Sequence, residues 1–394
     1  MTTAIDAGRF FQTDESIEQI ERKSRKSANT FGEPLKLGSK LLAIEAAGQR
    51  VVYVAEAAGS VSEIRLSTND ISRSPRGPAA PLTCVALCRT TEATRVFAGC
   101  WDKSIWSYVP PNGARVQPQI TSFAAHADFV KCVAVVPTPD KQTILISGGA
   151  DGDVRLWTLD GKALGKISPK CRAIESIVLD PMSSAEAPVV FFSTSQREIF
   201  QMAIPPLAAI SSSALQLSAP IVVHETSVYK MVFDADGDLW TASADKTAKH
   251  LVRENGWQSD TVLPHPDFVR DVAVHDKYGL VITACRDEEV RIWNASSGQL
   301  VHIFTGHYEE VTGLALAEDL LLSVSIDGTL RRWSLAPVDL QKAIKEASDP
   351  DLAKDVPEPD TDLSMLTAEE EAELRAMMEG EEASVMEAMA KDEQ

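Results

Sequence analysis

The chain has 394 residues, enough for two or three average domains or for one large all-β domain. Its apolar share of 44% and its charged share of 24% are ordinary for a globular protein with a core, so disorder throughout the chain is excluded. The formal net charge of −19 argues against direct binding of nucleic acid or of anionic membranes by most of the surface.

Long apolar runs are absent from the sequence. No stretch approaches 18 consecutive apolar residues, so we expect no membrane-spanning helix and no membrane partner. The first 21 residues are polar and acidic, and they lack the apolar middle of a secretory signal. None of the six cysteines belongs to a C-x₂-C pair, so we expect reduced thiols. A location in the nucleus or the cytoplasm is the expectation that follows.

Residues 1–30 form an extension that precedes the regular part of the chain. Residues 14–29 within it have the composition of a short helix. This stretch carries a basic cluster that consists of Arg22, Lys23, Arg25 and Lys26. Such a cluster resembles a weak nuclear-import signal, and it also fits a solvated run of charge. Of these two interpretations we favour the solvated run.

Three segments, at residues 125–157, 264–293 and 306–333, follow one spacing of polar residues. In each, His precedes Val by four residues, Ser or Thr precedes Asp by four, and Trp follows that Asp by six. The quartets are His126, Ser147, Asp151 and Trp157; His265, Thr283, Asp287 and Trp293; and His307, Ser323, Asp327 and Trp333. Short alternating apolar runs lie between these residues and predict β-strands.

Four further units are less regular. Two keep part of the quartet: residues 224–251 retain His224, Thr241 and Asp245, and residues 81–108 retain Asp102. The other two keep only the strand pattern and lie at residues 41–66 and 173–202. Seven units at intervals of roughly 40–50 residues match the blade number and blade length of a β-propeller.

This pattern resembles the WD-repeat β-propeller family. The resemblance implies an all-β fold, a seven-bladed propeller over residues 31–335, with four antiparallel strands in each blade. It also implies that His, Ser or Thr, Asp and Trp of one unit form a chain of hydrogen bonds. Such a network satisfies buried polar groups that would otherwise be costly.

His, Ser and Asp together also suggest a nucleophilic triad. The trio recurs at one spacing in three units, however, and an enzyme has one active site, so a structural role is expected. No catalytic residue is assigned. The seven histidines are scattered, and none pairs with a Cys at ligand spacing, so we expect neither a metal site nor a cofactor. His275 and the other histidines outside the quartets are expected to be surface or strand residues.

The resemblance also implies that a strand near the N-terminus completes the last blade and closes the ring, which removes two exposed sheet edges. Residues 31–38 are the best candidate for this strand, and residues 8–13 are the alternative.

Positions on one rim of the ring follow from the resemblance by spacing. They are the residue just before the turn Asp and the residues on either side of the Val that follows His. Aromatic or basic residues occupy several of them: Trp101, Phe129, Lys131, Tyr229, Phe268, Arg270 and Arg286. Aromatic residues and Arg are enriched at interface hot spots, so we expect a partner site for an acidic or mixed protein segment. The alternative is that some of these aromatic rings only pack the loops.

Residues 336–394 hold 18 acidic and 5 basic side chains, a net charge of −13. Residues 336–363 are predicted to be a linker rich in Pro and Asp, and residues 364–394 an acidic, partly helical tail. Apolar residues at helical spacing line one face of that tail. It is either a solvated segment or an amphipathic helix that docks on a partner or on the propeller.

The sequence therefore predicts a scaffold or adaptor and not an enzyme. It would bind protein partners through the rim and the acidic tail, as an assembly factor or chaperone for a basic client. The alternative is a non-catalytic subunit of a chromatin- or RNA-modifying enzyme complex. In either case we expect a monomeric propeller within a complex of different proteins.

Overall fold

A computed structural model describes residues 22–74, 77–89, 94–110, 119–210 and 215–348. Within these ranges, 28 strands form seven sheets of four antiparallel strands each. Blade 1 contains β2 (Leu41–Ala46), β3 (Val51–Glu56), β4 (Val61–Arg65) and β5 (Ile71–Arg73); blade 2 contains β6 (Leu82–Arg89), β7 (Thr94–Cys100), β8 (Ser104–Val109) and β9 (Gln119–Ala124); blade 3 contains β10 (Val130–Pro137), β11 (Thr143–Gly149), β12 (Val154–Thr158) and β13 (Ala163–Ile167).

The remaining four blades continue the same order. Blade 4 contains β14 (Ile174–Leu179), β15 (Val189–Thr194), β16 (Glu198–Ala203) and β17 (Ile221–Val222); blade 5 contains β18 (Val228–Phe233), β19 (Leu239–Ser243), β20 (Thr247–Val252) and β21 (Gln258–Pro264); blade 6 contains β22 (Val269–His275), β23 (Leu280–Cys285), β24 (Val290–Asn294) and β25 (Leu300–Phe304); blade 7 contains β26 (Val311–Ala317), β27 (Leu320–Ser325), β28 (Thr329–Ser334) and β1 (Leu35–Lys36). Short helical elements are α2 (Leu207–Ile210) and η2 (Asp276–Tyr278).

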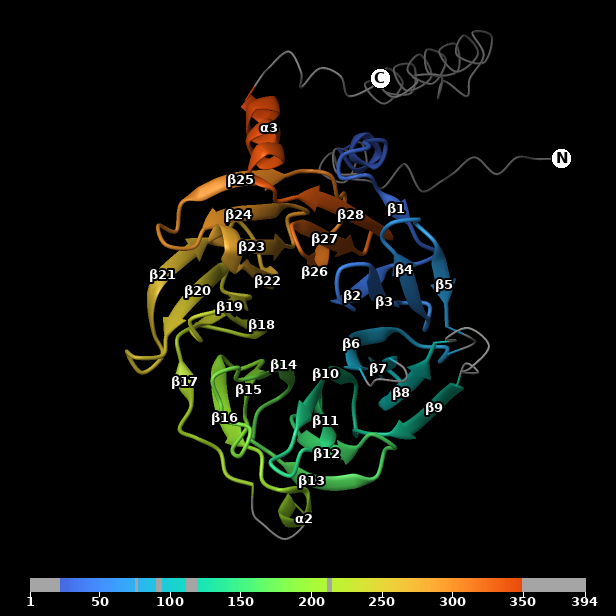
Figure 1. Ribbon diagram of the computed structural model, residues 1–394, viewed down its shortest axis with the longest axis vertical. Helices are drawn as coiled ribbons and strands as arrows, with labels where there is room; N and C mark the ends of the chain where they lie inside the picture. Colours follow the sequence, from blue (N-terminus) through green and yellow to red (C-terminus); the bar gives the residue numbers. More distant parts are fainter. Residues whose placement is uncertain (1–21, 75–76, 90–93, 111–118, 211–214, 349–394) are drawn as a thin grey trace, which may run out of the picture.

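The seven sheets stand around one axis, as blades do in a propeller (Figure 1). The strands nearest the centre of the ring are β2, β6, β10, β14, β18, β22 and β26. We call the face at which these strands begin the upper face, and the other the opposite face. Because strands alternate in direction, the turn between the second and third strands of each blade also lies on the upper face.

Ring closure joins the two ends of the chain. Strand β1 lies within residues 31–38 and pairs antiparallel with β28, where Leu35 faces Leu330. The Arg331 side chain, which is only 1% exposed, donates to Asn29 Oδ1 at 2.7 Å and to the Phe31 carbonyl. These contacts fix the segment that leads into β1 and complete the fourth strand of blade 7. Residues 8–13, the alternative strand, lie outside the described residues.

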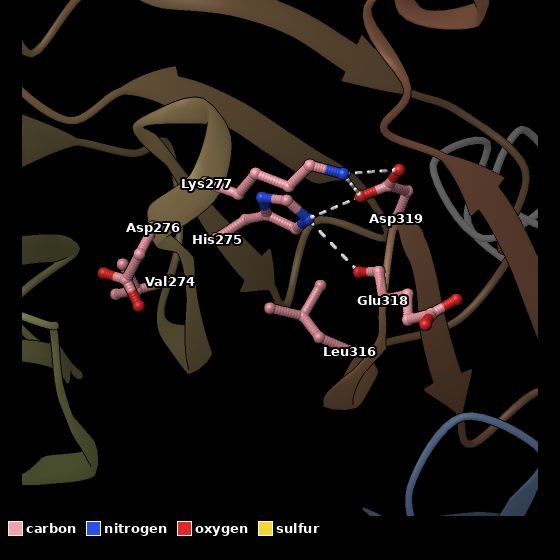
Figure 2. Close-up of a pocket in the computed structure, with 7 residues that line it drawn as sticks. All are labelled: Val274, His275, Asp276, Lys277, Leu316, Glu318 and Asp319. Carbon is pink, nitrogen blue, oxygen red and sulfur yellow. Dashed lines mark hydrogen bonds and ion pairs between the residues drawn. The ribbon is translucent and has the colours of Figure 1, made fainter.

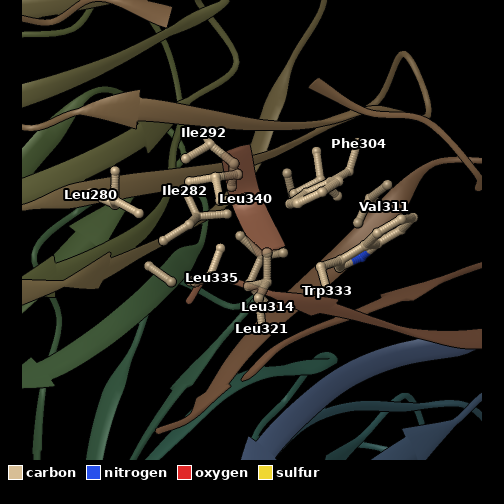
Figure 3. Packing of buried hydrophobic residues seen from close by; sticks show 13 residues of the cluster. Leu280, Ile282, Ile292, Phe304, Val311, Leu314, Leu321, Trp333, Leu335 and Leu340 are labelled. Atoms are coloured by element: carbon tan, nitrogen blue, oxygen red, sulfur yellow. The ribbon is translucent and has the colours of Figure 1, made fainter. Parts of the chain in front are cut away.

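The core consists of apolar layers between neighbouring blades. The second strand of a blade is buried on both of its faces, and all six residues of β23 are buried. This explains why such strands are nearly continuous apolar runs. Figure 3 shows the layer between blades 6 and 7, where Ile282 and Phe304 lie near Leu314 and Trp333.

Helix α3 (Pro337–Ser348) corrects the linker that the sequence predicts over residues 336–363. Leu340 is buried in the layer between blades 6 and 7, and Ala343 and Ile344 pack against the same cluster. These residues lie three and four positions apart, so they form one face of the helix. The linker prediction weighs the Pro and Asp content and misses this spacing. The tail at residues 364–394 lies outside the described residues.

Candidate functional site

Blade 3 contains a complete chain of buried hydrogen bonds. Trp157 Nε1 donates to Ser147 Oγ at 2.9 Å, and His126 Nε2 lies 2.8 Å from the same oxygen. His126 Nδ1 lies 2.9 Å from Asp151 Oδ1. Because Ser147 accepts from Trp157, its proton is free for His126 Nε2, so the other ring nitrogen carries a proton for Asp151. Each of the four side chains satisfies the next.

The same contacts recur in other blades. In blade 7, Trp333 Nε1 and His307 Nε2 lie 2.9 and 2.8 Å from Ser323 Oγ, and His307 Nδ1 lies 2.9 Å from Asp327. In blade 5, His224 lies 2.8 Å from Thr241 and 2.7 Å from Asp245, and Leu251 stands at the Trp position. In blade 2, Asp102 accepts from Ser104 and Trp106, with Trp106 Nε1 at 3.0 Å.

Blade 6 departs from the expected quartet. Thr283 accepts from Trp293 at 2.9 Å and lies 2.7 Å from His265 Nε2, but His265 Nδ1 lies 3.0 Å from the Leu263 carbonyl. Asp287 instead accepts two hydrogen bonds from Arg291, at 3.0 and 2.5 Å. The assignment of Asp287 to the network is therefore wrong, because a guanidinium binds a carboxylate more strongly than a neutral imidazole does.

Burial determines the protonation of these groups. Desolvation lowers the pKa of His126 and His307, and it lowers the pKa of His265 to about 4 with help from the Arg291 charge. Burial opposes ionisation of Asp151, yet the Ala127 amide and His126 hold its pKa below the ordinary value. The network therefore consists of neutral imidazole rings and ionised carboxylates.

The predicted quartet histidines do not share a site. His126, His265 and His307 lie in the polar networks of blades 3, 6 and 7, and each bonds to a hydroxyl of its own blade. In the part of the chain that the structure describes, no group of three or more His, Cys, Asp or Glu side chains is arranged to hold a metal ion. None of the helices in the described ranges has the length and apolar character that a bilayer crossing requires.

Every innermost strand contains a β-bulge at the same place on the upper face. The bulged residues are Leu42, Thr83, Lys131, Glu175, Tyr229, Arg270 and Thr312. A bulge turns a side chain away from the regular alternation and re-aims it. Several of these side chains reach the next blade: Thr83 donates to the Val130 carbonyl, and Thr312 donates to the Leu41 carbonyl at 2.9 Å.

The predicted basic residues of the rim are paired within the protein. Lys131 Nζ lies 2.6 Å from Glu175, and Arg270 forms an ion pair with Glu310 and lies over the Tyr229 ring at 4.6 Å. Arg286 lies over the Phe268 ring at 5.2 Å and 3.9 Å from Asp267. These residues join neighbouring loops and blades, so they form no free basic patch for an acidic segment. Glu175 and Glu310 lie in the next blade, 44 and 40 residues along the chain from their partners, so no local sequence signal marks these pairs.

Two of the predicted rim residues are exposed, and their aromatic rings stack on one another. Trp101, in the turn after β7, is 49% exposed, and Phe129, just before β10, is 39% exposed. Their rings stack with centroids 5.0 Å apart and an interplanar angle of 13°. The pair presents a flat apolar surface on the upper face between blades 2 and 3. We call these two residues the aromatic pair.

A second part of the upper face carries acidic residues that the sequence reasoning missed. Residues 22–27 are helical, and Arg22 and Lys26 lie 2.6 and 3.0 Å from Glu288. Lys26 also lies 2.7 Å from Glu289, and Lys23 lies 2.6 Å from Glu309. The solvated run favoured from the sequence misses these ion pairs, although Arg22 and Lys23 remain 54% and 40% exposed. Arg25, the fourth residue of the basic cluster, is exposed.

The opposite face has a hollow of about 510 Å³ between blades 6 and 7, also missed from the sequence. Figure 2 shows His275 and Lys277 both directed toward Asp319, with Lys277 Nζ 3.0 and 3.1 Å from its carboxylate oxygens. His275 is buried, donates from Nε2 to the Glu318 carbonyl at 3.2 Å, and stacks on Tyr278 with centroids 4.7 Å apart. It is a strand residue, as expected, but it is part of the packing.

Comparison with known proteins agrees with this geometry. The WD domain, G-beta repeat family matches residues 117–158, 257–294 and 298–334. The chain is 29% identical over 384 residues to the uncharacterized WD repeat-containing protein C126.01c of Schizosaccharomyces pombe, covering 94% of this chain and 97% of that protein. It is 26% identical over 211 residues to telomerase protein component 1 of Rattus norvegicus, which spans 50% of this chain but only 8% of that protein. The crystal structure of the WD40 β-propeller domain of Doa1 superposes with a TM-score of 0.63 at 15% identity, over 78% of this chain and 97% of that domain.

Proposed function

Because this chain belongs to the WD-repeat β-propeller family, we propose that it is a non-catalytic scaffold that binds protein partners on the upper face of its ring. Propellers of this family generally mediate protein–protein interactions. The internal bonding of the quartets supports the proposal, since it commits the His, Ser and Asp side chains to holding the blades together. Such side chains cannot also serve a reaction without breaking the network.

The observation that carries the proposal is the aromatic pair. Trp101 and Phe129 expose large apolar areas side by side. Burying an exposed aromatic side chain against a partner is worth about 1.5–3 kcal/mol, which makes such residues the usual anchors of an interface. The neighbouring bulged residues give the surface a rigid base.

The acidic segment suggests the chemistry of the partner. Residues 336–394 carry a net charge of −13, and the residues before them carry much less charge per length. An acidic segment in a protein that also carries an apolar anchor suits a client that is basic, since the segment screens the client's charge. We therefore propose an assembly or chaperone role for a basic client protein.

Affinity purification from the native source tests the proposal. The double variant Trp101→Ala/Phe129→Ala should lose the partners that the wild type retains. Met182→Ala is the matched control, because Met182 is also an exposed apolar residue, 57% exposed, but lies in the loop between β14 and β15 on the opposite face. Equal partner sets for all three proteins would refute the proposal. Retention of one catalytic polypeptide at fixed stoichiometry would select the enzyme-subunit alternative instead.

A further inference from the structure

The basic strap, which we define as Arg22, Lys23 and Lys26, lies on an acidic sector of the upper face. That sector consists of Glu288 and Glu289 in the turn after β23 and of Glu309 in the loop before β26. The two sides are 262 to 286 residues apart in sequence, yet four ion pairs of 2.6–3.0 Å join them. The chain thus holds a basic segment on its own rim.

The acidic sector is not neutralised from within the propeller. Among the described residues, the ion pairs of Glu288, Glu289 and Glu309 are all made with the strap. Burial raises the pKa of Glu289, the Lys26 charge opposes this rise, and Glu289 Oε2 is a buried acceptor without a donor. Three carboxylates that form no ion pair within their own blades favour a cationic ligand at this place.

The neighbouring cations are already committed elsewhere. Arg291 is taken by Asp287, and Arg286 lies by Asp267 and over Phe268. In blade 3, by contrast, the residue equivalent to Glu289 is Asp153, and it is bound by Arg155 of the same blade at 2.9 Å. Blade 6 differs from blade 3 in that its acidic turn receives a cation from outside the blade.

The strap itself is held loosely. Arg22 is 54% exposed and Lys23 is 40% exposed, so solvent screens their ion pairs, whereas Lys26 is 22% exposed and is the most firmly held residue of the strap. The fixed part of the N-terminal segment begins at Asn29, which accepts from the buried Arg331 and donates to the Gly306 carbonyl at 2.9 Å. The strap is therefore a tethered ligand, anchored at one end and exchangeable along the rest of its length.

From these contacts we propose that the acidic sector is a docking site for a Lys- and Arg-rich segment of a protein partner, and that the strap is a built-in competitor for it. The inference deepens the proposed function and rests on it for the existence of a basic client. The acidic sector is a second binding place on the ring, separate from the aromatic pair, and it binds the positive charges of the client. A client must displace the strap to engage both places.

Tethering sets the size of the competition. A ligand tethered by a few residues has an effective concentration on the order of 1 mM. A strap that binds with a Kd of about 0.1 mM therefore weakens a competing basic segment about tenfold. Because Arg22 and Lys23 lie exposed to solvent, binding of both the strap and its competitor should weaken as salt shortens the range of the charges.

The test measures binding of a fluorescein-labelled peptide, IERKSRKS, which has the sequence of residues 20–27, to the full chain by anisotropy. The opened variant is Arg22→Ala/Lys23→Ala/Lys26→Ala. The charge-matched control is Arg25→Ala/Lys162→Ala/Lys345→Ala, which removes three exposed cations that make no ion pair in the described part of the chain. A third variant adds Glu288→Gln/Glu289→Gln/Glu309→Gln to the opened one.

The opened variant should bind the peptide about five- to tenfold more tightly than the wild type and the control. The third variant should bind at least tenfold more weakly than the opened variant, and raising NaCl from 50 to 300 mM should weaken binding to the opened variant. Equal affinity of the opened variant and the wild type, or of the opened and third variants, overturns the proposal.

Hydrogen exchange of the wild type gives a readout that needs no substitution. Saturating peptide should speed exchange of the amides at residues 22–27, and unchanged exchange would also overturn the proposal. This test is independent of the test of the proposed function, since the variant Trp101→Ala/Phe129→Ala should still bind the peptide as the wild type does. Lost partners with no peptide competition would refute only the docking site, and the reverse would refute only the scaffold role.

Discussion

Arg291 binds both carboxylate oxygens of Asp287, at 3.0 and 2.5 Å, and by doing so removes Asp287 from the hydrogen-bond network of its blade. His265 then turns its second nitrogen to the Leu263 carbonyl at 3.0 Å. Burial lowers the pKa of His265 to about 4, with a further contribution from the Arg291 charge, although the hydrogen bond to the Leu263 carbonyl opposes the shift. The stability of the propeller should therefore depend on pH through this blade.

The pKa of His265 is about 4 in the folded protein against an ordinary value of 6.5, so the unfolded chain binds this proton more readily. The free energy of unfolding should fall as the pH drops from 6.5 toward 4, by up to about 3 kcal/mol. His265→Gln should be less stable at pH 7 but should show a shallower fall in this range. Urea unfolding at pH 7, 6 and 5 measures both. Parallel pH profiles for the two proteins would contradict the assignment.

Ser323 accepts a hydrogen bond from Trp333 and donates one to His307, so replacing it removes two hydrogen bonds. Ser323→Ala leaves Trp333 Nε1 and His307 Nε2 buried without their common partner, and each unpaired group costs about 1–3 kcal/mol. Urea unfolding should show a loss of about 2–6 kcal/mol. Ser297→Ala is the control, since Ser297 is exposed in the turn before β25 and bonds only locally. Equal midpoints for the two variants would count against the network.

Gly32 lies where the closing segment crosses Trp333. Its φ is +69°, and a Cβ there would come within 2.7 Å of the Trp333 ring. Gly32→Ala should cost about 2–4 kcal/mol, from backbone strain and from displacement of the ring. Gly256→Ala isolates the strain, because Gly256 has φ +66° with no atom within 4 Å of the added Cβ. Thermal melts in which the two variants lose equal stability would contradict the closure described here.

His275 packs the base of the hollow on the opposite face. Truncating it removes the stack on Tyr278 and the contact with the Glu318 carbonyl, so His275→Ala should destabilise the protein by about 1–3 kcal/mol. Lys277→Ala, which removes an exposed side chain of the same loop, should leave the midpoint of urea unfolding almost unchanged. A silent His275→Ala variant in a urea titration would show that the hollow is not part of the packing.

The repeated spacing predicts much of this architecture because it is local. The distances among Ser147, Asp151 and Trp157 follow from one hairpin, so the same spacing in blade 7 places Ser323, Asp327 and Trp333 alike. The closing strand can also be predicted, since the last repeat unit supplies only three strands and residues 31–38 precede the first unit.

In blades 3, 6 and 7 an arginine follows the turn Asp by four residues, and the sequence does not predict which group each arginine binds. Arg155 has Asp153 as a neighbour, and Arg331 binds Asn29. Arg291 donates to Asp287, while Lys26 donates to Glu289. These choices depend on partners up to 302 residues away, and no spacing in the chain encodes them. The aromatic pair could be placed on the rim from spacing, but its stacking and the pairing of the rim cations could not.

Site-specific photo-crosslinking tests the central claim most directly. A benzoylphenylalanine placed at Trp101 on the upper face, and in a second protein at Met182 on the opposite face, samples contacts within a few ångströms in the native source. Crosslinks to a defined basic protein from position 101, and none to that protein from position 182, are the expected result. Crosslinks to partners only from position 182, or no crosslinked protein from position 101, would contradict a scaffold that works through this rim.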